Sequence, residues 1–353
     1  MSDLGRKFDA YQAFVLGMKL HWTQHLYPQL QQKYICAAEH EPQAYAGTED
    51  VARLFAHDTD YAFFAWLERH LQSMKYSGLQ GLIPTHEQQR TKLERWLDAP
   101  LPAGLLELDP ELVAPRHFTG VDIHQHVGGV CGDSLAGVIY ERGARSTTPL
   151  LDKDLDLHFR FAATIASYTQ PTRILDLGCG FGKSTQPLHL EFYKAQVLGI
   201  DVSAPCLKLA ARITATAGVD KVRYAQKLAQ DSKLKSASFD LVSSTMLLHE
   251  MPPAAIKATL AETFRLLEPG GYAIHLDFLA DADPFKRFIH YGHSRRNNEP
   301  YMAPLNEMDL VAVHKQLGFE SVEILPFEES PGALGEHARA WRFPWALIVA
   351  RKA

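Results

Sequence analysis

The spacing of apolar residues predicts two halves of different architecture. Before residue 150, apolar positions recur at helical intervals, and few segments alternate as strands do. Helices are expected over residues 4–34 and 60–74, and after Pro84, where the next four residues fit a capping box. Residues 99–115 are rich in Pro, Leu and acidic side chains and are interpreted as a connector. The N-terminal half is therefore predicted to be mainly helical.

After residue 150, short apolar runs alternate with helical segments. Seven strands are expected, at residues 173–176, 196–201, 222–224, 239–243, 272–277, 321–325 and 345–350. Helices are expected between most of them. This alternation predicts an α/β fold with a doubly wound, mostly parallel, seven-stranded Rossmann-like sheet. We place an N-terminal helical domain at 1–150 and the sheet domain at 151–353.

The amino-acid composition limits the classes of binding partner that we expect. The 353 residues contain 36 Lys and Arg against 41 Asp and Glu, a net charge of −5. A protein that neutralises many phosphates is usually basic, so a nucleic-acid partner is not expected. No apolar stretch approaches the ~20 residues of a membrane span, and the first residues lack the apolar core of a signal peptide. The four cysteines form no C-x-x-C pair, so we expect a cytoplasmic protein without a membrane partner. A homodimer is left open.

A glycine-rich turn follows the first predicted strand after residue 150. The sequence DLGCGFGKS at 176–184 lies where a strand passes into a helix, a common position for nucleotide-like ligands. A dinucleotide fingerprint needs glycine where Lys183 stands, and a P-loop needs glycine where Leu177 stands. The pattern D-x-G-x-G-x-G fits at every position.

With this turn, residues 150–353 resemble the class I S-adenosylmethionine-dependent methyltransferases, nearest to the ubiquinone-biosynthesis type. The resemblance implies S-adenosyl-L-methionine as cofactor and S-adenosyl-L-homocysteine as product. It implies that an acidic residue at the end of the second strand, Asp201, holds both ribose hydroxyls. The other cofactor-binding residues that it implies near these two strand ends are Asp176, Gly178, Gly180, Gly182 and Val202.

Two further segments match the same family. Residues 238–242 resemble its entry into the fourth strand, and residues 266–271 resemble the turn before its fifth strand. Between strands three and four the family places a polar residue on the adenine amino group. Asp231 is the preferred candidate here, with Gln230 as the neighbouring alternative.

The segment after the fourth strand faces the methyl acceptor in the family. Here it contains Met246 and His249, which are assigned to the acceptor site. His249 is the candidate general base, with an expected pKa of about 5–8. The alternative is a structural histidine that bonds to backbone. Glu250 either orients His249 or is solvated.

Two segments are expected to form walls of the site. The insertion near 281–306 is interpreted as a substrate cap, with Tyr291, Arg295 and Tyr301 as candidate contacts. A solvated basic turn is the alternative for Arg295.

The glycine-rich segment that precedes the sheet domain contains His124, His126 and Tyr140. A His-x-His pair in a strand presents both rings on one face, as a metal site needs, but no matching pair of ligands is evident, so no metal is expected. We interpret the segment as a lid, with Tyr140 on the cofactor and His124 or His126 on the acceptor.

These features predict a methyltransferase that acts on a small organic acceptor by direct in-line transfer. Family resemblance ranks oxygen first as the acceptor atom, followed by nitrogen, sulfur and carbon. An RNA or protein methyltransferase and a non-catalytic cofactor-binding interaction protein are the alternatives.

Overall fold

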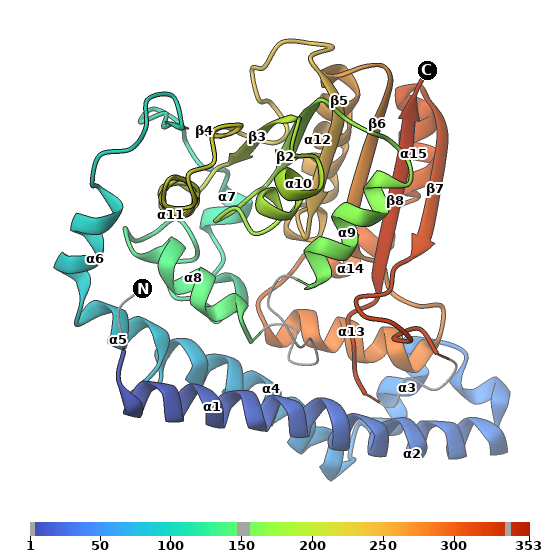
Figure 1. The fold of residues 1–353 in the computed structure, drawn as a ribbon. Coiled ribbons are helices and arrows are strands. Elements are labelled where there is room, and N and C mark those ends of the chain that lie inside the picture. Colours follow the sequence, from blue (N-terminus) through green and yellow to red (C-terminus); the bar gives the residue numbers. More distant parts are fainter. Residues whose placement is uncertain (1–3, 147–155, 336–339) are drawn as a thin grey trace.

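An eight-stranded, mostly parallel sheet forms the centre of the molecule. The computed structural model describes residues 4–146, 156–335 and 340–353 (Figure 1). The strands run in the order β1-β4-β3-β2-β5-β6-β8-β7, and β8 runs antiparallel to the other seven. They are β1 (Leu106–Glu107), β2 (Arg173–Leu177), β3 (Gln196–Asp201), β4 (Val222–Gln226), β5 (Phe239–Thr245), β6 (Leu267–Phe278), β7 (Phe319–Pro326) and β8 (Trp345–Lys352). The predicted fold class is confirmed, whereas the expected boundary at residue 150 lies outside the described residues.

Helices cover both faces of the sheet. Side chains alternate between the faces along each strand, so Ile174 and Leu175 belong to different hydrophobic clusters. The first cluster includes helices α9 (Asp156–Ala166), α10 (Thr185–Glu191) and α11 (Ala204–Ala217), and the second includes α12 (Pro253–Leu266) and α15 (Leu310–Leu317). Both strand faces are therefore buried, which explains why the central strands read as continuous apolar runs.

The sheet has one strand more than predicted. The two-residue strand β1 lies within the Pro-rich segment that was interpreted as a connector, and Leu106 pairs with Tyr224 in parallel. Two residues are too few to show an alternating pattern. By pairing there, β1 covers an otherwise open edge of β4.

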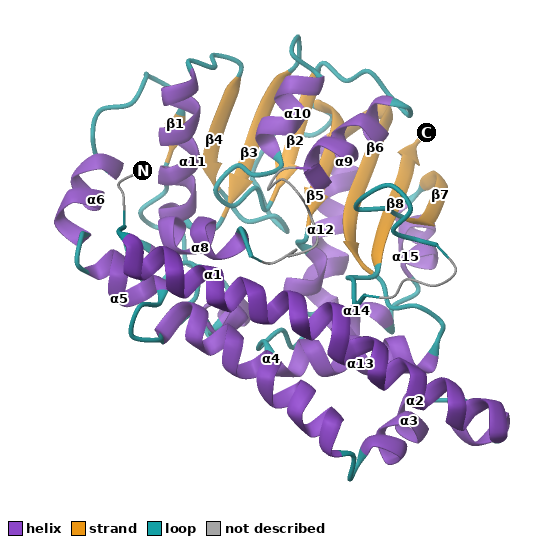
Figure 2. Ribbon diagram, turned by 60° about the horizontal axis from the view of Figure 1, so that its bottom comes forward, coloured by secondary structure: helices purple, strands orange, loops and turns teal. Residues whose placement is uncertain are grey.

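The N-terminal helices cross the carboxyl ends of the parallel strands, as Figure 2 shows. They are α1 (Arg6–His21), α2 (Tyr27–His40), α3 (Thr48–Phe55), α4 (Thr59–Ser77), α5 (Leu82–Glu87), α6 (Arg90–Leu97), α7 (Arg116–Thr119) and α8 (Ala136–Ala144). Helices α13 (Pro284–Arg296) and α14 (Met302–Asn306), which follow β6, lie beside them. The two halves share aromatic packing, since Tyr34 stacks on Phe285 and Phe55 on Phe288. Among the described residues, no helix is long and apolar enough to cross a membrane.

The predicted capping box after Pro84 is wrong. Helix α5 already begins at Leu82, with Gly81 as its N-cap, so Thr85 is a buried residue inside the helix. Proline is tolerated in a first turn because the backbone N–H that it lacks has no helical partner there.

A π-helical turn, Trp22–Leu26, joins α1 to α2. The N–H of Tyr27 bonds to the carbonyl of Trp22, and Pro28 has no N–H to offer the carbonyl of Thr23. That carbonyl instead accepts the N–H of Trp341 at 3.0 Å. The wide turn thus attaches the C-terminal segment to the first helices, and Trp22 and Thr23 both border the cavity described next.

Candidate active site

A cavity of about 220 Å³ lies between the carboxyl ends of the central strands and the N-terminal helices. This is the position at which doubly wound sheets bind ligands. Its lining includes nine of the residues predicted for the site: His124, Tyr140, Gly178, Gly180, Asp201, Val202, Gln230, Met246 and His249. The cavity therefore brings the expected cofactor and acceptor residues together.

The glycine turn after β2 follows an unusual backbone path. Gly178, Gly180 and Gly182 have φ angles of 64°, 52° and 83°, a region that side chains disfavour. A Cβ on Gly178 would lie 2.6 Å from Leu247 Cδ1, and one on Gly182 would lie 2.7 Å from the Tyr224 hydroxyl oxygen. A Cβ on Gly180 would meet only Tyr140, at 4.0 Å. Gly178 and Gly182 thus permit close packing, and Gly180 leaves open space at the cavity.

Asp176 supports this turn from below. It is fully buried, and one of its oxygens accepts hydrogen bonds from the hydroxyls of Ser184 (2.7 Å) and Thr185 (2.6 Å). Burial raises its pKa to about 6, against the lowering effect of these two hydroxyls. Asp176 does not border the cavity. The expectation of a direct cofactor contact is thus replaced by a positioning role, because its carboxylate is used to fix the start of α10.

Asp201, at the end of β3, closes the same turn from the side. One carboxylate oxygen accepts the N–H of Gly180 at 2.8 Å, and the other accepts the N–H of Ser203 at 2.7 Å. Burial raises its pKa. A carboxylate has about four lone-pair positions, so two remain for the hydroxyls of a diol. Together with the space at Gly180, these remaining acceptor positions fit the ribose diol of S-adenosylmethionine.

The structure places the two candidates for the adenine contact in different surroundings. Gln230 borders the cavity. Asp231 is exposed and pairs with Lys233 at 2.6 Å. The short bridge between Leu228 and Asp231 turns the chain at this point, so the neighbouring side chains face different surroundings. The preference for Asp231 is therefore corrected in favour of Gln230.

His249 lies between two carboxylates. Its Nδ1 hydrogen-bonds to Asp277 at 2.6 Å, and its Nε2 lies 3.4 Å from Oε1 of Glu250. Burial opposes its charge, but Asp277 and Glu250 outweigh that effect and raise its pKa well above the usual value. The expected titration at pH 5–8 is therefore corrected upward. Glu250 is not a solvated group, since its side chain is only 13% exposed.

His124 reaches the same glutamate from the N-terminal half. Its Nε2 lies 3.4 Å from Oε1 of Glu250, and its Nδ1 hydrogen-bonds to Glu299 at 2.8 Å. Burial lowers the pKa of His124, but Glu299 and Glu250 together raise it to about 9. The ring lies parallel to that of Tyr140, with 6.1 Å between centroids. One carboxylate oxygen of Glu250 thus joins a histidine from each half.

The segment around His124 is not a strand. Residues Ile123–Gln125 form a 3₁₀ turn in which His124 has a φ of 56°. His126 is buried away from the cavity, stacked on Tyr76 with 4.9 Å between centroids. Burial and the neighbouring cations lower its pKa to about 4. The two histidines therefore do not share a face, and the acceptor role expected for His126 is not supported by its position.

The cap residues predicted from the sequence also lie elsewhere. Arg295 is exposed, and Tyr291 and Tyr301 are partly exposed; none of the three borders the cavity. Tyr301 touches it only indirectly, through an edge-on contact with His117 at 6.2 Å. Neighbouring residues of the same segment border the cavity instead, namely His293, Asn297 and Glu299. Residues of the predicted insertion therefore border the cavity, but they are His293 on α13 and Asn297 and Glu299 just after its end.

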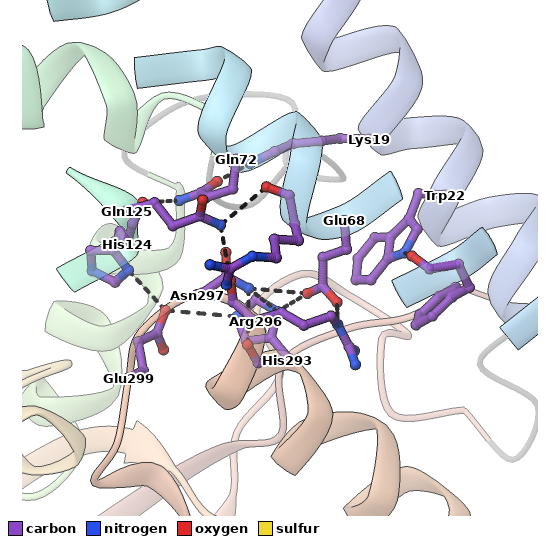
Figure 3. Close-up of polar contacts among 12 residues, drawn as sticks. Lys19, Trp22, Glu68, Gln72, His124, Gln125, His293, Arg296, Asn297 and Glu299 are labelled. Carbon is purple, nitrogen blue, oxygen red and sulfur yellow. Dashed lines mark hydrogen bonds and ion pairs between the residues drawn. The ribbon is translucent and has the colours of Figure 1, made fainter. Parts of the chain in front are cut away.

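A chain of alternating acidic and basic side chains continues into the N-terminal helices (Figure 3). Glu299 lies between His124 and His293, whose Nε2 is 3.9 Å away. His293 and Arg296 both bind Glu68 of α4, and the pKa of Glu68 is lowered to about 2 because these cations outweigh its burial. No local motif marks Glu68 or Glu299, since their partners are remote in the sequence.

Comparison with known proteins identifies the central part of the chain. Residues 174–271 match the family of methyltransferase domains. An uncharacterized methyltransferase of Synechocystis sp. is 36% identical over 99 residues, 28% of this chain and 43% of that protein. The demethylmenaquinone methyltransferase of Lactiplantibacillus plantarum is 36% identical over 106 residues, 30% of this chain and 44% of that protein. The chain thus spans less than half the length of these two relatives.

Solved structures also align with part of the chain. The phosphoethanolamine N-methyltransferase 2 of Haemonchus contortus, in complex with S-adenosyl-L-methionine, aligns with a TM-score of 0.43 and 17% identity, over 62% of this chain and 61% of that one. An S-adenosylmethionine-dependent methyltransferase of Mesorhizobium loti aligns with a TM-score of 0.42 and 22% identity, over 56% of this chain and 100% of that one.

Proposed function

We propose that this chain, which carries a class I S-adenosylmethionine-dependent methyltransferase domain, methylates a small organic acceptor by direct in-line transfer. The observation that carries the proposal is a single cavity that joins the glycine turn and Asp201 to His249 and Glu250. Such a cavity places a cofactor and an acceptor side by side, and positioning of this kind supplies much of the rate of a displacement.

On the cofactor side, Asp201 accepts the ribose hydroxyls, Gly180 admits the ligand next to its backbone, and Gln230 contacts the adenine. When bound, S-adenosylmethionine supplies a methyl group that is activated by the sulfonium. Tyr140, His124 and the N-terminal helices exclude water around it, which strengthens the electrostatic interactions inside the cavity.

On the acceptor side, the cavity is bordered by α1 and α4 as well as by the loop after β5. A site covered in this way favours a small molecule over RNA or a folded protein. Oxygen is the acceptor atom that we test first, followed by nitrogen, sulfur and carbon, in the order set by the family resemblance.

His249 holds a proton between Asp277 and Glu250 at neutral pH. It can act as a base only after losing this proton, at a pH above the ordinary range of histidine. If the acceptor must lose a proton, activity therefore rises with pH through an alkaline limb.

We also propose that residues 121–146 close over the bound ligands. Their contacts to the site, through His124 and Tyr140, are the basis. Hydrogen exchange in this segment should slow when S-adenosylhomocysteine is added, while exposed helix α2 is unaffected. Equal exchange with and without the ligand would contradict closure.

A screen with radiolabelled cofactor tests the activity. The protein and its Asp201→Ala variant are incubated with pools of small molecules, RNA and proteins. We expect label in the small-molecule pool for the unmodified protein and much less for the variant. Label only in RNA or protein, or equal labelling by the variant, would overturn the proposal, and cofactor binding without any transfer would favour a non-catalytic protein.

A further inference from the structure

Two buried carboxylate oxygens beside the cavity lack a hydrogen-bond donor. They are Oε2 of Glu250 and Oε2 of Glu299, neither of which is bonded to any residue that the structure describes. The side chain of Glu299 is 3% exposed, and both residues border the cavity. A buried carboxylate oxygen without a donor is unfavourable, so a ligand that supplied donors to this pair would be stabilised.

The two glutamates flank the same imidazole. Their Oε1 atoms face opposite nitrogens of His124, at 3.4 Å for Glu250 and 2.8 Å for Glu299. His124 therefore uses one oxygen of each carboxylate and leaves the second oxygen of each. The nearby cations are already engaged, since Lys19 donates to Gln72 at 3.1 Å and Arg296 pairs with Glu68.

An aromatic wall stands next to this acidic pair. Trp22, Trp341, Phe343 and Phe278 border the cavity and pack successively, with centroid distances of 5.0, 4.7 and 4.5 Å. The wall contacts two histidines that lie next to the glutamates. Trp341 packs on His293, whose Nε2 lies 3.9 Å from Glu299. Phe278 packs on His249, whose Nε2 lies 3.4 Å from Glu250. A flat apolar body is well accommodated against such a wall.

We propose that the acceptor is recognised through a nitrogen group with at least two N–H bonds, which donates to Glu250 and Glu299 while the apolar body of the acceptor packs on the aromatic wall. The inference rests on the proposed function and defines its acceptor class. Ammonium, guanidinium and amide groups share this chemistry. The nitrogen group is the end that is recognised, and the methylated atom is a separate question.

Other head groups satisfy the site less well. A hydroxyl has one hydrogen and can donate to only one of the two oxygens. A carboxylate has no hydrogen to donate at neutral pH, and a phosphate carries at least one negative charge there, so either group would be repelled by the two carboxylates. A positively charged nitrogen gains further from the aromatic faces, so it should bind more tightly than a neutral amide.

Four probes of matched shape test the proposal: benzylamine, benzamide, benzyl alcohol and benzoate. Their binding is measured by calorimetry or ligand-observed NMR on the full chain saturated with S-adenosylhomocysteine. We expect benzylamine to bind at least about tenfold more tightly than benzyl alcohol or benzoate, with benzamide between them. The ratio of benzylamine to benzamide separates a charged head group from a neutral one.

Two variants and a control locate the site. Glu299→Gln and Glu250→Gln should each weaken benzylamine at least about tenfold and leave benzyl alcohol within about twofold, because each replaces a negative oxygen with an amide. Glu307→Gln, an exposed change at the end of α14, should have no effect.

The proposal is overturned if benzyl alcohol or benzoate binds as tightly as benzylamine, if neither glutamate variant weakens benzylamine, or if none of the four probes binds. A separate titration with S-adenosylhomocysteine distinguishes this failure from failure of the proposed function, which requires cofactor binding whichever acceptor is used. A glutamate variant that weakens S-adenosylhomocysteine instead of benzylamine would assign the free oxygens to the cofactor and also overturn the proposal.

Discussion

The proposed cofactor side and acceptor side of the cavity are formed by different kinds of groups. The cofactor side is made of backbone and strand ends: the positive φ of Gly180, and the carboxylate of Asp201 that accepts two backbone N–H groups. The acceptor side is made of side chains from helices and loops that are far apart in sequence, such as Glu68, His124 and Glu299. The cofactor side thus depends mainly on local backbone geometry, whereas the proposed acceptor side depends on the tertiary packing of side chains.

The largest expected effect is a loss of stability when the ion pair between Glu68 and Arg296 is broken. In Glu68→Leu, the guanidinium of Arg296, whose side chain is 12% exposed, loses its carboxylate. Breaking a buried pair on one side typically costs about 3–5 kcal/mol. We expect the free energy of unfolding, measured by urea denaturation at pH 7, to fall by about this amount.

Two controls bracket that result. Glu39→Leu, at an exposed position of α2, should change stability by less than about 0.5 kcal/mol. The pKa of Glu68 is lowered from 4.5 to about 2 in the folded protein, so its contribution is complete above about pH 4.5 and is lost as the pH falls toward 2. The difference between the variant and the unmodified protein should shrink over that range, and a loss below 1 kcal/mol at pH 7 would mean that this pair does not stabilise the fold.

The next effect comes from removing the carboxylate of Asp201, which borders the cavity at the glycine turn, whereas that of Asp176 does not. Asp201→Ala should weaken S-adenosylmethionine at least about tenfold in calorimetry, because hydrogen bonds to a charged group contribute ~1.5–3 kcal/mol each. Asp220→Ala, an exposed carboxylate at the entry to β4, serves as the matched control. Unchanged affinity in Asp201→Ala, with the fold retained, would remove the assignment of the ribose site.

The same contrast explains what could be predicted from the sequence. The glycine turn and Asp201 follow from local patterns, because the ligand contacts come from residues next to strands that the apolar runs already define. Strand β1 was missed because two residues carry no periodicity. Asp176 was assigned to the cofactor because the motif includes it, although its burial gives it a structural role.

Prediction was weaker on the acceptor side for a physical reason. His124 was selected because it lies in a glycine-rich segment with a His-x-His pair. Its partners Glu250 and Glu299 are set by tertiary packing and not by sequence spacing. Trp22 and Trp341 belong to no motif, and they come together through the π-helical turn, where the carbonyl of Thr23 accepts the N–H of Trp341. Within the predicted insertion at 281–306, the residues that border the cavity are one on α13 and two after its end, and their positions depend on how the helix ends and packs.

A smaller effect is expected at Glu250, which contacts a histidine from each half of the chain. Glu250→Gln removes a negative charge from both His249 and His124. The negative charge of Glu250 favours the protonated imidazoles, so its loss should lower the pKa of both histidines. For His124, whose pKa is about 9, NMR titration of the ring protons should show the midpoint move toward neutral pH.

The pH dependence of activity should shift in the same direction as these pKa values. If His249 is the base, its neutral form appears at lower pH in Glu250→Gln, so the alkaline limb of the rate shifts to lower pH. Glu307→Gln should leave both the titration and the limb in place. An NMR shift without any change in the limb would show that His249 only positions other groups.

The smallest effect separates two neighbours on the cofactor side. Gln230 borders the cavity, while Asp231 is exposed and paired with Lys233 on the surface. An exposed ion pair contributes little, typically 0–1 kcal/mol, and Asp231 has no access to a ligand in the cavity. Asp231→Ala should therefore change S-adenosylmethionine affinity by less than about twofold, while Gln230→Ala, which removes one neutral hydrogen bond worth about 1 kcal/mol, should weaken it about fivefold. Calorimetry on both variants gives the comparison directly. A larger loss in Asp231→Ala than in Gln230→Ala would restore Asp231 as the adenine contact, and it would require this loop to rearrange when the cofactor binds.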